Sequence, residues 1–219
     1  MAVVADVNTL APPLAQGLAV LGLPLSAAQQ QALLAYVALL AKWNKTYSLT
    51  AIREPERMVP QHLLDSLAPL PAFDRLGATR ILDVGSGFGT PGIPLAIARP
   101  DWQFTLLDAN QKKTTFLRQA VMDLRLANVS VVNGRVEAVE QEGGFDIITS
   151  RAFAELADFI AWTRHLLAPA GSWLALKGVW PHDEIAKLPV DIAVNSVDHL
   201  AVPGVEAERH VVHLTVKRT

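Results

Sequence analysis

Cysteine is absent from this chain of 219 residues, and its absence removes several chemistries. A disulfide scaffold and a thiolate-based metal site are both excluded. Enzymes that methylate carbon 5 of pyrimidines generally attack the base with a cysteine, so that reaction is excluded as well. The lack of cysteine also agrees with a reducing cytoplasm, where we expect the protein to be located.

An excess of positive charge is also missing, because the formal net charge is −2 at pH 7. Nucleic-acid-binding domains usually carry a basic excess, so composition alone does not indicate such binding. Basic residues do gather in two segments, and each is either a local phosphate-binding patch or a solvated helix face. The first segment contains Lys42, Lys45, Arg53 and Arg57, and the second contains Lys112, Lys113, Arg118 and Arg125.

Long apolar runs are missing too. The segment from residue 10 to residue 41 has no charged residue, but three prolines and a glutamine triplet interrupt it. Its longest uninterrupted apolar run, Ala32–Ala41, has half of the about twenty residues that a membrane span needs. A secretory signal has basic residues near its start, whereas the first positive charge here is Lys42. We therefore expect a soluble protein without a membrane partner.

The apolar pattern divides the chain into two parts. Residues 1–78 are predicted to be helical, with a capping box at Ser26 and Gln29 and a further helical stretch over Pro55–Leu70. Residues 79–219 alternate short apolar runs with amphipathic stretches, which is typical of a mostly parallel sheet with helices on both faces. The predicted strands are Arg80–Val84, Phe104–Asp108, Val129–Val132, Asp146–Ser150, Ser172–Lys177, Ile192–Val202 and Arg209–Val216. The predicted helices between them are Pro91–Ala98, Lys112–Leu126, Val136–Gln141 and Ala154–Leu167.

The most informative stretch is a short apolar run that leads into a glycine-rich turn. Its glycines stand at alternate positions, Gly85, Gly87 and Gly89, with Asp83 two residues before the first. A dinucleotide fingerprint needs G-x-G-x-x-G, and Thr90 occupies the place of its third glycine. The D-x-G-x-G-x-G string instead resembles the first motif of the Rossmann-like S-adenosylmethionine methyltransferases. A plain flexible turn is the alternative.

The end of the chain supports the same fold. The last two predicted strands are joined by residues 203–206, a connection too short for a parallel crossover, so we predict an antiparallel hairpin. The expected fold is therefore α/β, resembling a class I methyltransferase with a mostly parallel seven-stranded sheet and an antiparallel last strand. Residues 1–78 would form a helical extension, and residues 79–219 the S-adenosylmethionine-dependent methyltransferase domain.

Polar residues at the ends of the predicted strands are the candidate site, because open parallel sheets bind ligands beyond the carboxyl ends of their strands. Asp83 is expected to orient the glycine turn or to meet the methionine ammonium through water. Asp108 can accept hydrogen bonds from ribose hydroxyls, although it can also be a helix N-cap. Glu137 and Arg151 follow the next two strands, and their alternatives are a first-turn helix charge and a surface cation.

The chain as a whole, from about residue 33 to its end, resembles the bacterial glucose-inhibited division protein B family of small-subunit ribosomal RNA guanine-N7 methyltransferases. The string W-N-K-x-Y-x-L-T and the tripeptide S-R-A are highly specific when they occur together with the glycine motif. The matching segments are Lys42–Thr50, His62–Ser66, Asp83–Pro94, Leu107–Asp108, Lys112–Lys113, Phe116–Leu117, Arg135–Glu137, Ser150–Ala152, Ala175–Gly178 and Glu208–His210.

The resemblance implies S-adenosylmethionine as cofactor and 16S rRNA, free or in the 30S particle, as partner. The implied target is N7 of the guanine at position 527, in the loop near the decoding centre. The implied cofactor contacts are Gly85, Thr90, Val136, Glu137 and Arg151. Two positions depart from the family: Ser48 replaces a usual asparagine in a loop that could contact RNA, and Thr90 replaces a common apolar residue.

The residues themselves restrict the reaction. Methyltransferases of exocyclic amines often carry an N-P-P-Y-like string after the fourth strand, whereas residues 149–153 read T-S-R-A-F. Guanine N7 has a free lone pair and needs no general base, so we assign no catalytic residue. Lys112 and Lys113 are the preferred phosphate ligands, and Lys45 and Arg53 are further candidates for RNA contacts. Trp43 and Tyr47 fit packing of the extension better than base stacking.

Other functions remain open from the sequence. A methyltransferase of a small molecule or a protein would use the extension as a lid, and a non-enzymatic regulator would bind nucleotide on a retained fold. The histidines are scattered, and His210 and His213 lie three apart on a predicted strand and so face opposite sides. We predict no metal site, and since nothing requires a dimer, we expect a monomer.

Overall fold

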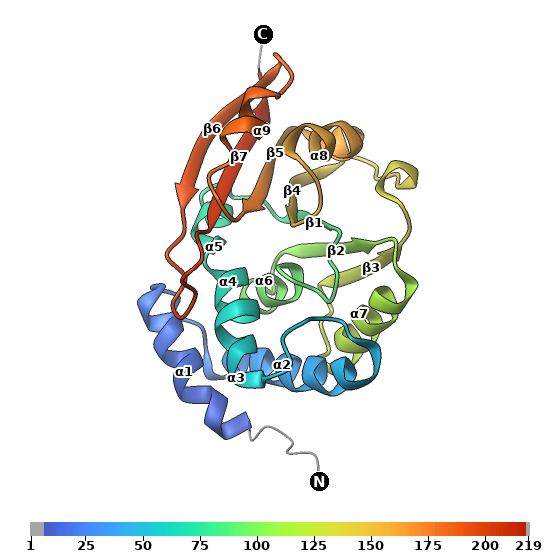
Figure 1. Cartoon of the computed structure of the whole chain (residues 1–219). Coiled ribbons are helices and arrows are strands. Elements are labelled where there is room, and N and C mark those ends of the chain that lie inside the picture. The colour runs from blue at the N-terminus through green and yellow to red at the C-terminus, as the bar shows by residue number, and fades with distance from the viewer. Residues whose placement is uncertain (1–6, 218–219) are drawn as a thin grey trace.

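The computed structural model describes residues 7–217, in which seven strands form one sheet with the order β3-β2-β1-β4-β5-β7-β6 (Figure 1). The strands are β1 Arg80–Val84, β2 Gln103–Asp108, β3 Val129–Asn133, β4 Phe145–Arg151, β5 Leu167–Lys177, β6 Ile192–His199 and β7 His210–Val216. Strands β1 to β5 pair in parallel, and β7 pairs antiparallel with both β5 and β6. The predicted parallel sheet and its terminal hairpin are therefore confirmed.

Helices cover both faces of this sheet. The α-helices are α1 Val7–Val20, α2 Ala27–Tyr47, α3 Pro55–Met58, α4 Asp65–Leu67, α5 Leu70–Asp74, α6 Gly92–Ala98, α7 Gln111–Asp123, α8 Leu156–Thr163 and α9 His182–Ala186. A π-helix, η1 (Val59–Leu64), and two 3-10 turns, η2 (Val136–Ala138) and η3 (Arg164–Leu166), complete the set within the described residues. No helix of this range is long and apolar enough to cross a membrane.

The central strands are buried on both sides, as the helices on both faces require. Along β1, Ile81 belongs to a hydrophobic cluster with α6, α7 and the extension, whereas Leu82 and Val84 belong to a second cluster with α8. Alternate residues of a strand point to opposite faces, so each face has its own core. Leu10 and Leu33 of the extension lie in the first cluster. The helical extension thus packs against the sheet, and the division at residue 78 stays a prediction.

The extension is held by one long helix, α2. Its capping box forms as predicted, with Gln29 N donating to Ser26 Oγ at 3.3 Å and Ser26 N donating to Gln29 Oε1 at 2.9 Å. Its buried residues recur at helical spacing, Leu33, Tyr36, Val37, Leu40 and Asn44. The helix ends at Ser48, which has a left-handed backbone (φ +50°).

Some predicted boundaries are wrong. The helix expected over 136–141 is only the 3-10 turn η2. The helix expected over 154–167 is the shorter α8, which is followed by the 3-10 turn η3. Strand β5 begins at Leu167, five residues before its predicted start. The helical stretch of 55–70 is a short α-turn, the π-helix η1 and α4, with Pro60 in the first turn of η1. π-helical turns are frequent at functional sites.

Candidate active site

The glycine turn follows β1 and brings the backbone close to its surroundings. Gly85 (φ +69°) and Gly87 (φ +60°) have the left-handed backbone that glycine adopts without strain. A Cβ on Gly85 would lie 2.6 Å from the Phe153 ring, and one on Gly89 would lie 2.5 Å from Ile93 Cδ1. Gly85 therefore lets the Phe153 ring pack directly on the turn, whereas Gly89 is needed for packing of the turn against α6.

Asp83 lies beneath this turn and is fully buried. Its Oδ2 accepts a hydrogen bond from Gly92 N at 3.1 Å, which ties β1 to the start of α6. Its Oδ1 has no hydrogen-bond partner within residues 7–217. Burial raises the pKa of this carboxyl to about 7. Of the two predicted roles, orientation of the turn is the one that this environment supports.

Asp108 ends β2 and already organises two loops. Its Oδ2 accepts from Gly87 N at 2.9 Å, and its Oδ1 accepts from Asn110 N at 2.8 Å. The N-cap of α7 is Asn110, whose side chain accepts from Lys112 N and Lys113 N, so the N-cap alternative for Asp108 is wrong. Each carboxylate oxygen has a second lone pair, so Asp108 can still accept from ribose hydroxyls.

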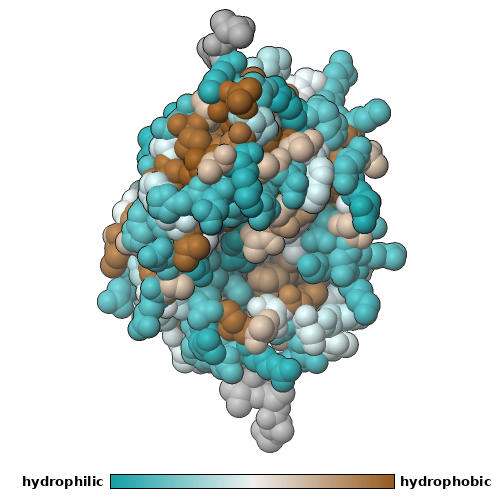
Figure 2. Space-filling view, turned by 45° about the horizontal axis from the view of Figure 1, so that its top comes forward, coloured by the Kyte–Doolittle hydropathy of each residue, from teal (hydrophilic) through white to brown (hydrophobic). Residues whose placement is uncertain are grey.

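Two cavities lie at the carboxyl ends of the strands and share Gly85, Lys113 and Ala152. The larger cavity has a volume of about 520 Å³ and the smaller of about 420 Å³. The molecular face in Figure 2 is hollowed near its centre, where apolar residues lie among hydrophilic ones. Predicted site residues that line the larger cavity are Gly85, Gly87, Thr90, Lys113 and Arg151, and those that line the smaller are Gly85, Asp108, Lys113, Val136 and Glu137.

The smaller cavity combines acidic and aromatic side chains. Asp108 at the end of β2 and Glu137 in the turn after β3 line it. Glu137 is also the first-turn acidic residue of η2, and its contact with the cofactor stays a prediction. Phe153 and Trp162 line its other side, with ring centroids 5.8 Å apart in an edge-to-face arrangement. A planar group with a hydroxylated sugar fits this combination of apolar wall and carboxylates.

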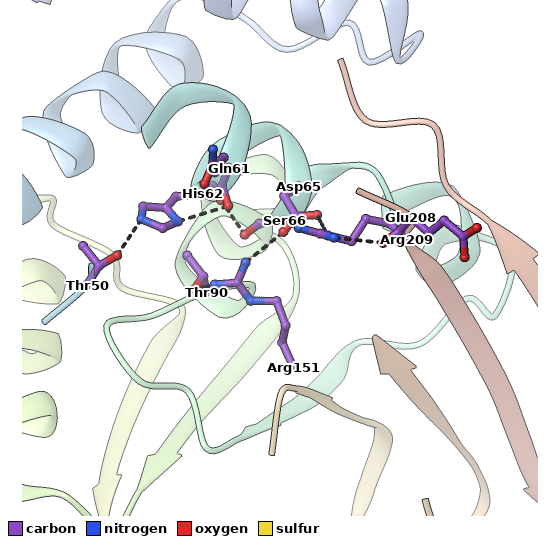
Figure 3. Close-up of polar contacts among 9 residues, drawn as sticks. All are labelled: Thr50, Gln61, His62, Asp65, Ser66, Thr90, Arg151, Glu208 and Arg209. Carbon is purple, nitrogen blue, oxygen red and sulfur yellow. Dashed lines mark hydrogen bonds and ion pairs between the residues drawn. The ribbon is translucent and has the colours of Figure 1, made fainter. Parts of the chain in front are cut away.

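The larger cavity has a charged wall built around Asp65 of α4, whose side chain is 4% exposed (Figure 3). Asp65 Oδ2 accepts from Arg151 Nη1 at 3.0 Å, and Oδ1 accepts from Arg209 Nε at 2.7 Å. Arg151 also donates to Thr90 Oγ1. Arg151 is thus held in the site, and the surface-cation alternative is wrong. One carboxylate cannot neutralise two guanidinium groups, so the wall keeps a net positive charge.

A buried histidine of the extension, His62, contacts the glycine turn. His62 Nε2 lies 3.1 Å from Thr50 Oγ1, and its Nδ1 lies 3.0 Å from the carbonyl oxygen of Gln61 (Figure 3). Burial and the nearby Arg151 charge lower the pKa of His62 to about 4, so the ring is neutral at pH 7. The ring also packs on Phe88 of the turn, with centroids 4.7 Å apart. His62 is therefore a structural link.

The predicted RNA ligands differ in their position. Lys113 lines both cavities and lies 3.8 Å from Asp108 Oδ2. Lys112, Lys45 and Arg53 are exposed and line neither cavity. Trp43 packs the extension against Phe116 of α7, as predicted, whereas Tyr47 lies on the outer side of Trp43 and is 48% exposed.

Sequence reasoning missed part of this site. Asp65 and Arg209 lie in segments that matched the family, yet they received no role, because only the folded chain brings them together. Phe153 and Trp162 carried no sequence signal beyond their place after β4. Among the described residues there is no group of three histidine, cysteine, aspartate or glutamate side chains that could hold a metal ion.

Comparisons with known proteins identify the family. A family model described as rRNA small subunit methyltransferase G matches residues 29–212. The ribosomal RNA small subunit methyltransferase G of Laribacter hongkongensis is 60% identical over 201 residues, which are 92% of this chain and 96% of that protein.

Solved structures share the fold at low identity. A SAM dependent methyltransferase from Aquifex aeolicus matches with a TM-score of 0.59 and 16% identity, over 77% of this chain and 97% of that one. A SAM-dependent methyltransferase from Thiobacillus denitrificans, in complex with S-adenosyl-L-homocysteine, matches with a TM-score of 0.54 and 18% identity, over 80% and 98%. These matches confirm the predicted fold and agree with the predicted cofactor. The chain belongs to the rRNA small subunit methyltransferase G family, the family that its motifs predicted.

Proposed function

We propose that the protein transfers a methyl group from S-adenosylmethionine to N7 of a guanine in 16S rRNA, the guanine at position 527 of the decoding-site loop. It would act as a monomer in the cytoplasm, on free 16S rRNA or on the 30S particle. The observation that carries this proposal is the pair of cavities that meet at Gly85, Lys113 and Ala152. One can hold a nucleoside, and the other presents cations to a second, anionic molecule.

The smaller cavity suits the adenosine half of the cofactor. Asp108 would accept hydrogen bonds from the ribose hydroxyls, and Val136 and Glu137 would border the adenine. Gly85 lines both cavities, and its lack of a Cβ lets Phe153 pack directly on the turn. The methionine half would follow the backbone of Gly85 and Gly87 from the smaller cavity into the larger one.

The methionine carboxylate would lie toward Arg151 and Thr90 in the larger cavity. A guanidinium binds a carboxylate through charge-assisted hydrogen bonds. Asp83 would hold the glycine turn in place from below, through its bond to Gly92, and Gly89 would keep the turn against α6. These residues would bind and orient the cofactor without taking part in proton transfer.

The reaction requires alignment and no general base. When bound, S-adenosylmethionine supplies an electrophilic methyl group on a sulfonium centre. The N7 lone pair of guanine is free at neutral pH, so no protein group has to remove a proton. Holding two reactants in line can contribute about 7–11 kcal/mol of barrier reduction. The histidines near the site are consistent with this account, because His62 is neutral and buried and the Nδ1 of His210 is 2.7 Å from the carbonyl of Gly178.

The charge of the larger cavity supports an RNA substrate. Arg209 donates through Nε to Asp65 and through Nη1 to the carbonyl of Glu208, whereas Nη2 has no acceptor within the described part of the chain. Arg209 and Lys113 would therefore contact phosphates beside the target base. Lys112, Lys45 and Arg53 lie farther out and would add nonspecific attraction that weakens with salt.

Methyl transfer from labelled S-adenosylmethionine tests the proposal. The substrates are 30S particles and naked 16S rRNA from cells that lack the gene, with 23S rRNA and tRNA as controls. After digestion to nucleosides, mass spectrometry should find label in 7-methylguanosine from 16S rRNA alone. Label in another nucleoside would contradict the target atom, and cofactor binding without transfer to any ribosomal RNA would favour a small-molecule or protein substrate.

A further inference from the structure

An exposed tryptophan stands beside the larger cavity at the carboxyl end of β5. Strand β5 ends at Lys177, and Lys177 and Gly178 line the cavity. The next two residues are unusually exposed for apolar side chains, Val179 at 74% and Trp180 at 41%. Core packing does not require either of them, so a large indole is kept at the mouth of the proposed active site.

Two histidine rings contact this indole, and a third packs on one of them. His210, which lines the cavity and is 5% exposed, lies edge-to-face with Trp180 at 5.5 Å between centroids. His182 lies 5.5 Å away on the other side of the turn, and His199 packs on His210 at 5.3 Å. An aromatic side chain that is already oriented loses little conformational entropy when a ligand stacks on it.

The segment that carries Trp180 is fixed at both ends. His210 Nδ1 lies 2.7 Å from the carbonyl oxygen of Gly178, and His182 N donates to the carbonyl of Trp180 at 3.0 Å. Glu184 of α9 accepts from Lys177 Nζ at 2.6 Å and from the backbone N of Leu156 at 2.7 Å. The indole is therefore carried by a turn that hydrogen bonds hold on both sides.

The chemistry around this turn favours a nucleobase as its ligand. Arg209, the neighbour of His210 in the chain, lines the larger cavity, and its Nη2 has no acceptor among residues 7–217, so it provides a cation for a phosphate. Single-stranded RNA is bound by this combination of cationic groups and aromatic faces. We propose that Trp180 is a stacking platform for an unpaired base of the RNA substrate, adjacent in the strand to the guanine in the larger cavity. This inference rests on the proposed function, since it requires RNA as substrate.

Steady-state kinetics of three variants test the platform, with 16S rRNA and 30S particles from cells that lack the gene as substrates. Trp180→Ala removes the ring, and Trp180→Phe keeps a smaller ring that can still stack. Val190→Ala is the matched control, because Val190 is an exposed apolar residue (89%) that lines neither cavity. Circular dichroism checks that each variant is folded.

Loss of one stacked base corresponds to about a 5- to 150-fold weaker interaction. We therefore expect Trp180→Ala to raise the KM for RNA within this range and to leave the KM for S-adenosylmethionine unchanged. Trp180→Phe should recover most of the loss, and Val190→Ala should match the wild type. A KM for RNA that is unchanged in Trp180→Ala overturns the inference, and so does an equal rise in the KM for the cofactor. If the wild type methylates no ribosomal RNA, the proposed function is overturned and this inference with it. If the wild type is active and Trp180→Ala has the same KM for RNA, the inference alone is overturned.

Discussion

Replacing Asp65 by asparagine removes the negative charge that pairs with both Arg151 and Arg209 while keeping the shape of the side chain. Breaking a buried ion pair by removing one partner costs about 3–5 kcal/mol. The two arginine side chains are 23% and 28% exposed, so they can turn partly toward water. We therefore expect Asp65→Asn to lower the free energy of unfolding by about 2–3 kcal/mol, below the full cost of a buried pair.

Thermal unfolding followed by circular dichroism measures this loss. For a domain of this size, 1 kcal/mol corresponds to about 2–4 °C, so Tm should fall by about 4–12 °C. Asp198→Asn is the matched control, because its ion pair with Arg75 has a similar distance of 2.8 Å but is largely exposed. Exposed pairs contribute about 0–1 kcal/mol. Equal shifts of Tm in the two variants would refute the claim that the buried ion pairs of Asp65 stabilise the fold more than an exposed ion pair does.

Three further predictions concern the cofactor side. Arg151→Ala should lower kcat/KM for S-adenosylmethionine by about 10- to 150-fold, which corresponds to the loss of a hydrogen bond to a charged group. A full rate in Arg151→Lys would contradict a contact in which two guanidinium nitrogens bind the methionine carboxylate. Gly85→Ala should abolish cofactor binding in calorimetry, because its Cβ would lie 2.6 Å from Phe153; Gly77→Ala has a similar positive φ without any close neighbour and should lose stability alone. Asp83 has a folded-state pKa of about 7, above its unfolded value, so its stabilising contribution is complete at low pH and is lost as the pH rises through 7. The free energy of unfolding in urea should therefore fall less between about pH 5 and pH 8 in Asp83→Asn than in the wild type, and an equal fall would show that this carboxyl is ionised in the fold.

Local sequence patterns correctly predicted the elements that depend mainly on neighbouring residues. The capping box at Ser26 and the short apolar strands are of this kind. The terminal hairpin is confirmed as well, although its connection spans residues 200–209 and not the predicted 203–206. Boundaries failed where tertiary contacts decide them. Leu167 pairs with Phe145 across a bulge, so β5 begins before the run that looked like a strand. The helix expected over 136–141 stops at residue 138 because Val139 already has an extended backbone (φ −87°, ψ 135°).

The residues of the candidate site at the strand ends could be predicted from the sequence, whereas those brought in by other elements could not. Asp108 and Arg151 end β2 and β4, and Glu137 lies four residues after β3, so the sheet topology brings them to one edge. Asp65 could not be found in this way, because its partners lie 86 and 144 residues away in the chain. The left-handed backbone of Ser48 gives a physical reason for the asparagine that the family usually has there, since asparagine tolerates this conformation well. The replacement of asparagine by Ser48 therefore affects the C-cap of α2 before it affects any contact with RNA.

The most direct test of the central claim is chemical cleavage of 16S rRNA at 7-methylguanosine, which maps the modified base in the cell. The RNA is taken from cells that lack the gene and from the same cells carrying either the wild-type chain or Arg151→Ala. We predict cleavage at position 527 with the wild-type chain, none without the gene, and strongly reduced cleavage with Arg151→Ala. Cleavage at another position, or no cleavage with a wild-type chain that is folded and binds S-adenosylmethionine, would contradict it.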